Sequence, residues 1–345
     1  MSKIIQISIV LLSILSGTAQ TSVRMESKYV FPPCNSVCDT IEHEAPGVCA
    51  HCNMVLVKKT DVKTIAFYLQ DGVEVLDFAG PLEVFAYSGY KVFTVSATKS
   101  PIISQGVLTV VPDYDITDAP KADILAFFGG NSSAVVKNPK VIEWVKRQEN
   151  VQHYFSVCTG AFILAEAGIL ENKTATTFHN ALEDLATSYP DVNVRKNVRF
   201  VDNGDVITTA GISAGIDGAL HLVAKLRGVN AAKRTAYYME YDTWEIGDGL
   251  ILSENNPYQN MPLISSLETY VGRYEFENGA EVEVKLDTKK GDLYALFDEL
   301  VYPLYHEKDD IFSDTSSRPI YFKRNGNGEV IGYSTSKDGK LFRKL

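Results

Sequence analysis

Five cysteines offer the most evident chemistry in this chain, and they fall into two groups. Four lie within nineteen residues near the N-terminus, whereas Cys158 stands alone. Cys158 ends an apolar, strand-like run and precedes small residues that open a helix-like run. A sharp strand-to-helix turn lifts a nucleophile above a sheet, and the N-terminus of the following helix lowers a thiol pKa. The pattern therefore predicts a nucleophilic Cys158, with a buried structural cysteine as the alternative.

The N-terminal group occupies a short module, residues 28–59, and consists of Cys34, Cys38, Cys49 and Cys52. A segment of this length cannot bury enough apolar surface to fold unaided. Two close pairs of thiolates suit tetrahedral zinc or Cu(I). We therefore expect a metal ion held by the four cysteines, with two disulfides or a redox-active dithiol as alternatives.

Residues 1–19 have the pattern of an export signal. Lys3 supplies a positive start, Ile4–Leu15 is a mostly apolar stretch that is short for a bilayer span, and Ala19 ends a run of small residues. We expect cleavage after Ala19 and a periplasmic or secreted protein that does not stay at the membrane. A retained N-terminal anchor is the alternative.

The chain has 345 residues, of which 45% are hydrophobic and 22% charged, so its composition is globular rather than disordered or fibrous. This length predicts two or three structural units. The 33 Lys and Arg against 43 Asp and Glu give a net charge of -10, which argues against nucleic acid as a partner.

Residues 61–245 alternate strand-like and helix-like runs, which predicts an α/β domain with a parallel sheet covered on both faces. Ligands of such sheets bind at the carboxyl ends of the strands. The expected strands are Thr64–Leu69, Val92–Ala97, Asp123–Phe128, Gln152–Val157 and Asp205–Thr209. The expected helices are Gly80–Ser88, Pro139–Gln148, Thr159–Gly168, Ala214–Arg227 and Ala231–Tyr241.

A linker, residues 246–266, precedes a different pattern in residues 267–345. Short alternating runs are separated by turns such as Asn278-Gly279 and Lys290-Gly291. This punctuation predicts an antiparallel β meander or small barrel.

Two further segments supply candidate site residues beside Cys158. Asp77 follows the first expected strand, and Gly129-Gly130 follows another. Backbone N–H groups at such a glycine pair can receive developing negative charge. A carboxyl beside a thiolate is expected to have a raised pKa and to share its proton with sulfur. A helix N-cap is the alternative role for Asp77, and Glu74 is the alternative acid.

Five segments in order resemble the ThiJ/PfpI family of the class I glutamine amidotransferase-like superfamily, and within it the isonitrile hydratase-like branch. They are Leu76-Asp77-x-x-Gly80-Pro81-x-Glu83-Val84-Phe85, Phe128-Gly129-Gly130, Val157-Cys158-Thr159-Gly160-Ala161, Ala175-Thr176-Thr177 and Gly211-Ile-Ser-Ala214-Gly-Ile-Asp217. The resemblance implies a flavodoxin-like sandwich with Cys158 as nucleophile and Asp77 as its acidic partner. It also implies an orienting role for Thr159, a backbone oxyanion site at Gly130 and Thr159, no cofactor in this domain, and a homodimer.

Many members of that family carry histidine directly after the Thr-Thr pair. Here Phe178 holds that place and His179 follows. Because a shift of one residue turns a strand side chain to the other face, a Cys–His dyad is not the expected pair. Glu83 is expected to be a helix residue that supports the fold.

The N-terminal module resembles the small heavy-metal-binding domain of bacterial metal efflux proteins, chiefly in Pro46-Gly-Val-Cys49-Ala-His-Cys52-Asn-Met54. That family usually opens with Cys-Pro-Met-His, whereas Phe31, Pro33 and Cys34 stand at the Cys, Met and His places here, and Cys38 is added. Coordination by four sulfurs would replace the family's mixed site. In the third module, the run from Leu267 to Tyr274 resembles a β domain of unknown function found in exported serine β-lactamase-like proteins.

The leading interpretation is an exported cysteine enzyme of the ThiJ/PfpI type that acts on a small molecule, as a hydro-lyase or hydrolase. Isonitrile hydration suits a Cys158–Asp77 pair. The main alternative is a protein that binds metal or senses redox stress, with a non-catalytic ThiJ/PfpI domain. A transcriptional regulator is a further alternative, because AraC-type regulators carry a similar domain, but here the C-terminus has a β pattern.

Overall fold

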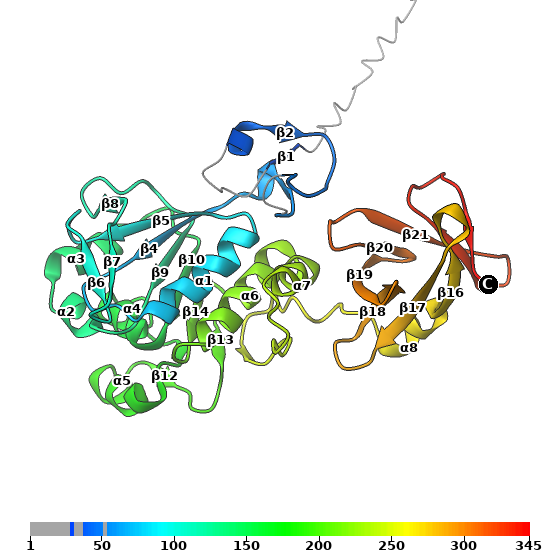
Figure 1. The fold of residues 1–345 in the computed structure, drawn as a ribbon. Coiled ribbons are helices and arrows are strands. Elements are labelled where there is room, and N and C mark those ends of the chain that lie inside the picture. Colours follow the sequence, from blue (N-terminus) through cyan, green and yellow to red (C-terminus); the bar gives the residue numbers. More distant parts are fainter. Residues whose placement is uncertain (1–27, 31–36, 51–53) are drawn as a thin grey trace, which may run out of the picture.

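The computed structural model describes residues 28–30, 37–50 and 54–345. It contains three parts in chain order: a small N-terminal sheet, an α/β domain and a C-terminal β domain (Figure 1). The predicted signal sequence, Cys34 and Cys52 lie outside the described residues. Within those residues, no helix is both long and apolar enough to cross a membrane.

The central sheet of the α/β domain has eight strands, and every pairing is parallel except that of β13 with β14. In spatial order they are β15 (Leu250–Ile251), β13 (Phe200–Asp202), β14 (Val206–Thr209), β10 (His153–Val157), β9 (Ile124–Phe127), β4 (Thr64–Tyr68), β5 (Lys91–Ser96) and β8 (Tyr114–Asp115). The predicted α/β fold with a mostly parallel sheet is confirmed.

Helices cover both faces of this sheet, because the strands carry apolar side chains on both faces. Alternate residues of β4 divide between two cores: Ile65 and Phe67 belong to one, Ala66 and Tyr68 to the other. The first core is covered by α1 (Val75–Tyr87), α6 (Ala214–Arg227) and α7 (Val229–Tyr238). The second is covered by α2 (Ser132–Val136), α3 (Pro139–Lys146), α4 (Ala161–Glu166) and α5 (Leu182–Ser188).

The α/β domain also contains smaller elements outside its central sheet. Two-stranded sheets are formed by β6 (Ile102–Ser104) with β7 (Leu108–Val110) and by β11 (Thr174–Ala175) with β12 (Asn193–Val194). Short 3₁₀ helices in the chain are η1 (Val37–Thr40), η2 (Lys59–Asp61), η3 (Cys158–Gly160), η4 (His179–Ala181), η5 (Glu268–Tyr270) and η6 (Glu277–Gly279).

Two helices differ from their predicted bounds near the candidate site. Helix α1 begins at Val75 rather than Gly80 and contains Pro81. The helix predicted from Thr159 is divided into η3 and the short α4. Asp77 therefore lies in the first turn of α1, and Cys158 begins a tight 3₁₀ turn.

The C-terminal domain is an antiparallel meander that nearly closes into a barrel, as the turn pattern predicted. Its strands follow chain order: β16 (Gly272–Glu275), β17 (Glu281–Asp287), β18 (Asp292–Phe297), β19 (Leu300–Lys308), β20 (Ile311–Ser313), β21 (Pro319–Arg324), β22 (Val330–Ser334) and β23 (Phe342–Arg343). A bridge between Tyr274 and Lys344 brings the last strand to the first. Helix α8 (Ile264–Leu267) precedes the meander, and aromatic rings fill its core.

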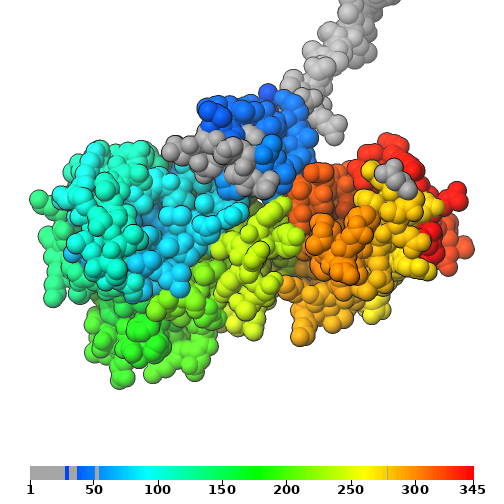
Figure 2. Space-filling model, in the orientation of Figure 1, coloured from blue at the N-terminus to red at the C-terminus, as the bar shows by residue number. Residues whose placement is uncertain are grey.

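The N-terminal part is a three-stranded sheet with the order β2–β1–β3. Its strands are β1 (Tyr29–Val30), β2 (Glu42–His43) and β3 (Val57–Lys58). Cys38 and Cys49 are buried against Leu56 in its small core. Figure 2 shows this part in blue, lying over the region between the α/β domain and the C-terminal domain.

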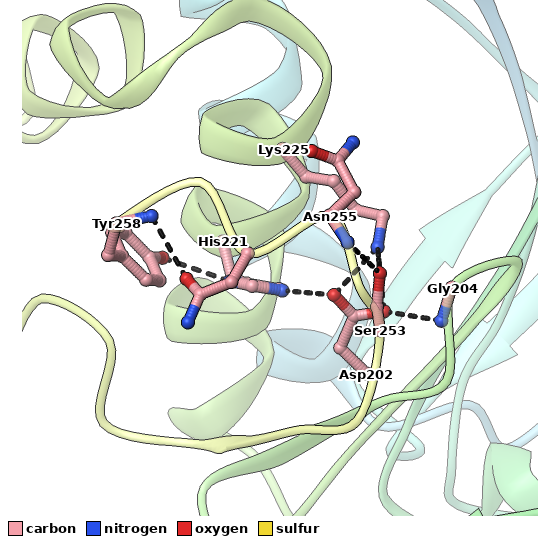
Figure 3. A network of polar contacts seen from close by, with 8 residues as sticks. Asp202, Gly204, His221, Lys225, Ser253, Asn255 and Tyr258 are labelled. Carbon is pink, nitrogen blue, oxygen red and sulfur yellow. Dashed lines mark hydrogen bonds and ion pairs between the residues drawn. The ribbon is translucent and has the colours of Figure 1, made fainter. Parts of the chain in front are cut away.

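A buried polar cluster fastens the predicted linker to the α/β domain (Figure 3). The Asp202 carboxylate contacts His221 Nε2 at 2.9 Å and Lys225 Nζ at 2.8 Å, and these three side chains are at most 4% exposed. From the linker, the Tyr258 hydroxyl bonds His221 Nδ1 and Ser253 Oγ accepts from Lys225 Nζ, both at 2.9 Å. With β15, these contacts attach residues 250–258 to the edge of the sheet.

Candidate active site

Cys158 lies at the end of β10 in a strained turn. Its φ is +58°, a left-handed conformation that is uncommon for residues other than glycine. Its N–H donates to the Ala210 carbonyl at 2.9 Å, and its carbonyl accepts from Thr177 Oγ1 at 2.7 Å. A Cβ on Gly160 would come within 2.3 Å of the Phe127 carbonyl, so the turn packs directly on β9. These contacts fix the thiol at the carboxyl ends of the parallel strands.

Asp77 is fully buried and is held by two backbone donors. The N–H of Gly129 donates to Oδ2 at 2.8 Å, and the N–H of Ile212 donates to Oδ1 at 3.0 Å. Gly129 follows β9 and Ile212 follows β14, so both donors come from the same sheet edge as Cys158. The alternative role of helix N-cap is taken by Glu74, which has no side-chain capping bond.

The Asp77 carboxyl and the Cys158 thiol meet over Gly129. A Cβ at Gly129 would lie 2.8 Å from Sγ of Cys158 and 2.7 Å from Oδ2 of Asp77. The two groups are close enough that each shifts the pKa of the other. Only glycine leaves room for this contact.

Burial governs the charge of this pair. Desolvation raises the pKa of Asp77 to about 6, against the opposing effect of its two backbone donors. Desolvation and the charge of Asp77 raise the pKa of the Cys158 thiol to about 12. At neutral pH the pair therefore holds one proton, and it titrates as a unit.

The raised thiol pKa corrects the prediction of a thiol acidified by the following helix. Cys158 is 7% exposed, and α4 is only a short helix separated from the thiol by η3. The Thr159 N–H bonds the sulfur and lowers the pKa of Cys158, but this effect is smaller than that of desolvation. The raised pKa of Asp77 is in the predicted direction.

The two predicted backbone donors differ in their surroundings. The Thr159 N–H already bonds the sulfur, while the buried Thr159 Oγ1 has no partner among the described residues. Gly130 has a φ of +85°, and a Cβ at this position would come within 2.2 Å of the Gly72 carbonyl oxygen. The backbone hydrogen bonds between residues 72–74 and 129–131 are donated by Glu74 to the Gly129 carbonyl and by Asn131 to the Gly72 carbonyl. The N–H of Gly130 does not take part in them. Thr159 Oγ1 is thus a buried hydroxyl whose hydrogen-bonding capacity the described residues leave unused.

The other candidate side chains do not join the pair. Glu83 is exposed on α1, and His179 is exposed at the start of η4. Phe178, not His179, packs against the core, over Gly211. Glu74 acts on the site through its charge, which raises the pKa of both Asp77 and Cys158.

Sequence reasoning assigned no role to two residues that build the site, Ile212 and Thr177, and it offered Gly129 as a donor to a substrate anion rather than to Asp77. Ile212 has a φ of +56°, a strained conformation for a β-branched side chain, and this strain aims its N–H at Asp77. All three belong to the segments quoted for the family resemblance. Membership in those segments was the one sequence feature that could have indicated them. Their contacts use backbone or hydroxyl groups, which many residue types could supply.

The α/β domain that holds this buried Cys–Asp pair is the part of the chain that a known family matches. The DJ-1/PfpI family model matches residues 63–225, and the chain belongs to this family. Isonitrile hydratase of Pseudomonas putida is 33% identical over 180 residues, which cover 51% of this chain and 78% of the hydratase.

Further comparisons reach proteins of other kinds. The HTH-type transcriptional regulator CdhR of Pseudomonas aeruginosa is 28% identical over 173 residues, covering 48% of this chain and 51% of the regulator. A crystal structure of a ThiJ/PfpI family protein from Pseudomonas syringae is 26% identical with a TM-score of 0.49, covering 59% of this chain and 80% of that protein. Residues 260–341 match a domain of unknown function (DUF3471).

Proposed function

We propose that this protein is a cysteine enzyme that hydrates a small isonitrile, with Cys158 as nucleophile and Asp77 as acid and base. The observation that carries the proposal is the buried Asp77 carboxyl lying beside the Cys158 thiol over Gly129, at the carboxyl ends of the parallel strands. The similarity to an isonitrile hydratase supports the choice of reaction.

The reaction needs one nucleophile and one shuttled proton. Asp77 takes the thiol proton as Sγ attacks the terminal carbon of the isonitrile, and then gives that proton to the carbon. The product of this step is a thioimidate on Cys158. Water then adds to its carbon, and Asp77 takes one proton from the water and passes it to nitrogen. The C–S bond of this adduct breaks as its hydroxyl becomes the formamide carbonyl, and Asp77 carries the hydroxyl proton to sulfur. The net change is isonitrile plus water to an N-substituted formamide.

The burial of the thiol restricts what can reach it. Cys158 is 7% exposed and Asp77 is fully buried, so a bulky group cannot reach the thiol. An isocyano group is linear and ends in the carbon to be attacked. The unpartnered Thr159 Oγ1 supplies a hydrogen bond for substrate nitrogen or the attacking water.

Formamide formation from a small alkyl isonitrile tests the proposal. We expect the full chain to produce the N-alkyl formamide, measured by NMR, and Cys158→Ser to lose about a thousandfold or more in turnover. Turnover should fall as pH drops through about 6, because protonated Asp77 can no longer take the thiol proton. Glu83→Gln, an exposed change on the same helix, is the matched control. No formamide from the parent protein, or undiminished turnover by Cys158→Ser, would exclude this mechanism.

We also propose metal binding by the N-terminal module, which was the second interpretation of the sequence. Cys38 Sγ and Cys49 Sγ lie 3.7 Å apart in a buried position. A tetrahedral zinc ion with Zn–S distances of about 2.3 Å separates its sulfur ligands by about 3.8 Å. The spacing supports zinc or Cu(I) held by this pair, with Cys34 and Cys52 as the remaining predicted ligands.

Metal content of the purified full chain tests this site. We expect about one zinc or copper ion per chain by elemental analysis, and a loss of most of it in Cys49→Ser. Cys158→Ser is the matched control and should retain the metal. Absence of metal from protein supplied with both ions under reducing conditions, or an unchanged content in Cys49→Ser, would contradict the proposal and leave disulfides as the alternative.

A further inference from the structure

Arg227, the last residue of α6, is a cation without a matching anion. Its Nε is buried and has no hydrogen-bond partner among the described residues, and none of their carboxylates forms an ion pair with it. Burial lowers the pKa of Arg227 below its usual range. Asp61 influences the guanidinium through charge alone, and the buried Tyr90 hydroxyl nearby also has no partner. Arg227 as a whole is only partly buried, but a guanidinium taken partly out of water normally has a partner because desolvation is costly.

The Arg227 side chain lines a cavity of about 240 Å³ between the α/β domain and the C-terminal domain. One wall is the start of α7, from Gly228 to Ala231, and another is formed by His306 and Glu307 of β19. The linker segment from Pro257 to Pro262 contributes the third wall. In Figure 1, α7 lies between α6 and the strands of the C-terminal domain.

Arg227 also lines a smaller cavity on its other side, where all three parts of the chain meet. Val55 and Val57 of the N-terminal part, Ser88 after α1, and Ser317 of the C-terminal domain line this second cavity. Figure 2 shows the N-terminal part lying above this junction. A ligand at Arg227 would therefore touch surfaces from separate parts of the chain.

The charges around the larger cavity leave a positive excess. Lys233 Nζ pairs with Asp292 at 2.7 Å, and Arg234 Nη1 lies 3.5 Å from Glu307. Each carboxylate in the lining thus has its own cation, and Arg227 is left over. The beginning of α7 adds its N-terminal partial positive charge and N–H groups that have no partner within the helix.

We propose that the cavity at Arg227 binds a small oxyanion, the phosphate or carboxylate group of a ligand, between the α/β and C-terminal domains. The planar guanidinium matches either group through paired N–H donors. Lys233 and Arg234 screen their own carboxylates and keep the cavity positive. The bound anion supplies the missing counter-charge and joins the two domains.

Melting temperatures of the full chain test this site at pH 7.5. We expect sodium phosphate or sodium acetate to raise the melting temperature by about 3 °C over sodium chloride at the same ionic strength. Arg227→Met should lose this response. Without oxyanion it should melt no lower than the parent, because it removes a partly buried charge that pairs with no carboxylate of the described residues. Arg147→Met, an exposed change on α3, should keep the full response.

A response to phosphate alone identifies a phosphate group as the ligand, and a response to acetate alone identifies a carboxylate. Should Arg227→Met fail to fold, Arg227→Lys keeps the charge without the planar donors, and equilibrium dialysis with labelled phosphate or acetate should find at least tenfold weaker binding. No stabilisation of the parent beyond that in chloride, or an undiminished response or affinity in the Arg227 variants, would overturn the proposal.

Discussion

Replacing Asp77 by alanine is expected to change turnover and thiol reactivity in opposite directions. Turnover should fall about 100- to 10,000-fold, because the group that moves the proton is gone. The thiol should alkylate faster near neutral pH, because the charge of Asp77 no longer raises the pKa of Cys158. The measurements are formamide production and the pH dependence of alkylation, followed by mass spectrometry.

This pair of readouts separates a chemical role from a structural one. Asp77→Ala also leaves the N–H groups of Gly129 and Ile212 without their acceptor, so a loss of turnover alone could reflect a displaced turn. Asp77→Asn keeps one of the two oxygen acceptors and should show the same opposite changes. If both variants leave the pKa of the Cys158 thiol where it was, Asp77 is not its electrostatic partner.

Replacing Asp202 by alanine should be among the most destabilising single changes in the α/β domain. The variant leaves the ammonium of Lys225 buried without its carboxylate, and it removes the acceptor of His221. Breaking a buried ion pair in this way costs about 3–5 kcal/mol. Urea unfolding of the full chain, followed by tryptophan fluorescence and circular dichroism, measures the change.

Two variants serve as controls for the Asp202 result. Asp205→Ala removes an exposed partner of Lys173 and should change the free energy of unfolding by about 1 kcal/mol or less. Adding Lys225→Met to Asp202→Ala should recover part of the loss, because no unpaired ammonium remains. A loss no larger than that of Asp205→Ala would mean that water enters the cluster and screens it.

The fold was predictable where local pattern and burial agree. The β4 segment is apolar after Thr64, because the sheet buries both of its faces, and the glycine turns marked the C-terminal hairpins. The short strands β13 and β15 escaped prediction. Each is two or three residues long, and β15 lies in the predicted linker and gains its strand geometry from pairing with β13. The start of α1 was misplaced because proline favours the first turn of helices, and here Pro81 lies inside one.

The candidate site was predictable in its side chains but not in its backbone. The model brings Cys158 and Asp77 together from distant segments, and nothing in their spacing reports that Gly129 lies between them. The direction of the thiol pKa was wrong, because desolvation depends on tertiary packing around Cys158. Ile212 donates its N–H from a backbone with positive φ, and an isoleucine in the sequence gives no indication of such a conformation.

The pairing of β15 with β13 has a practical consequence for dissecting this protein. A fragment cut at residue 245 would lose β15 and uncover the hydrogen-bonding edge of β13. It would also lose Ser253 and Tyr258, exposing Lys225 and His221 to water. Bare strand edges recruit other strands, so such a fragment is prone to aggregate through its own sheet. An excised α/β domain should extend at least through Tyr258, and a fusion that carries this domain should keep the connecting segment with it.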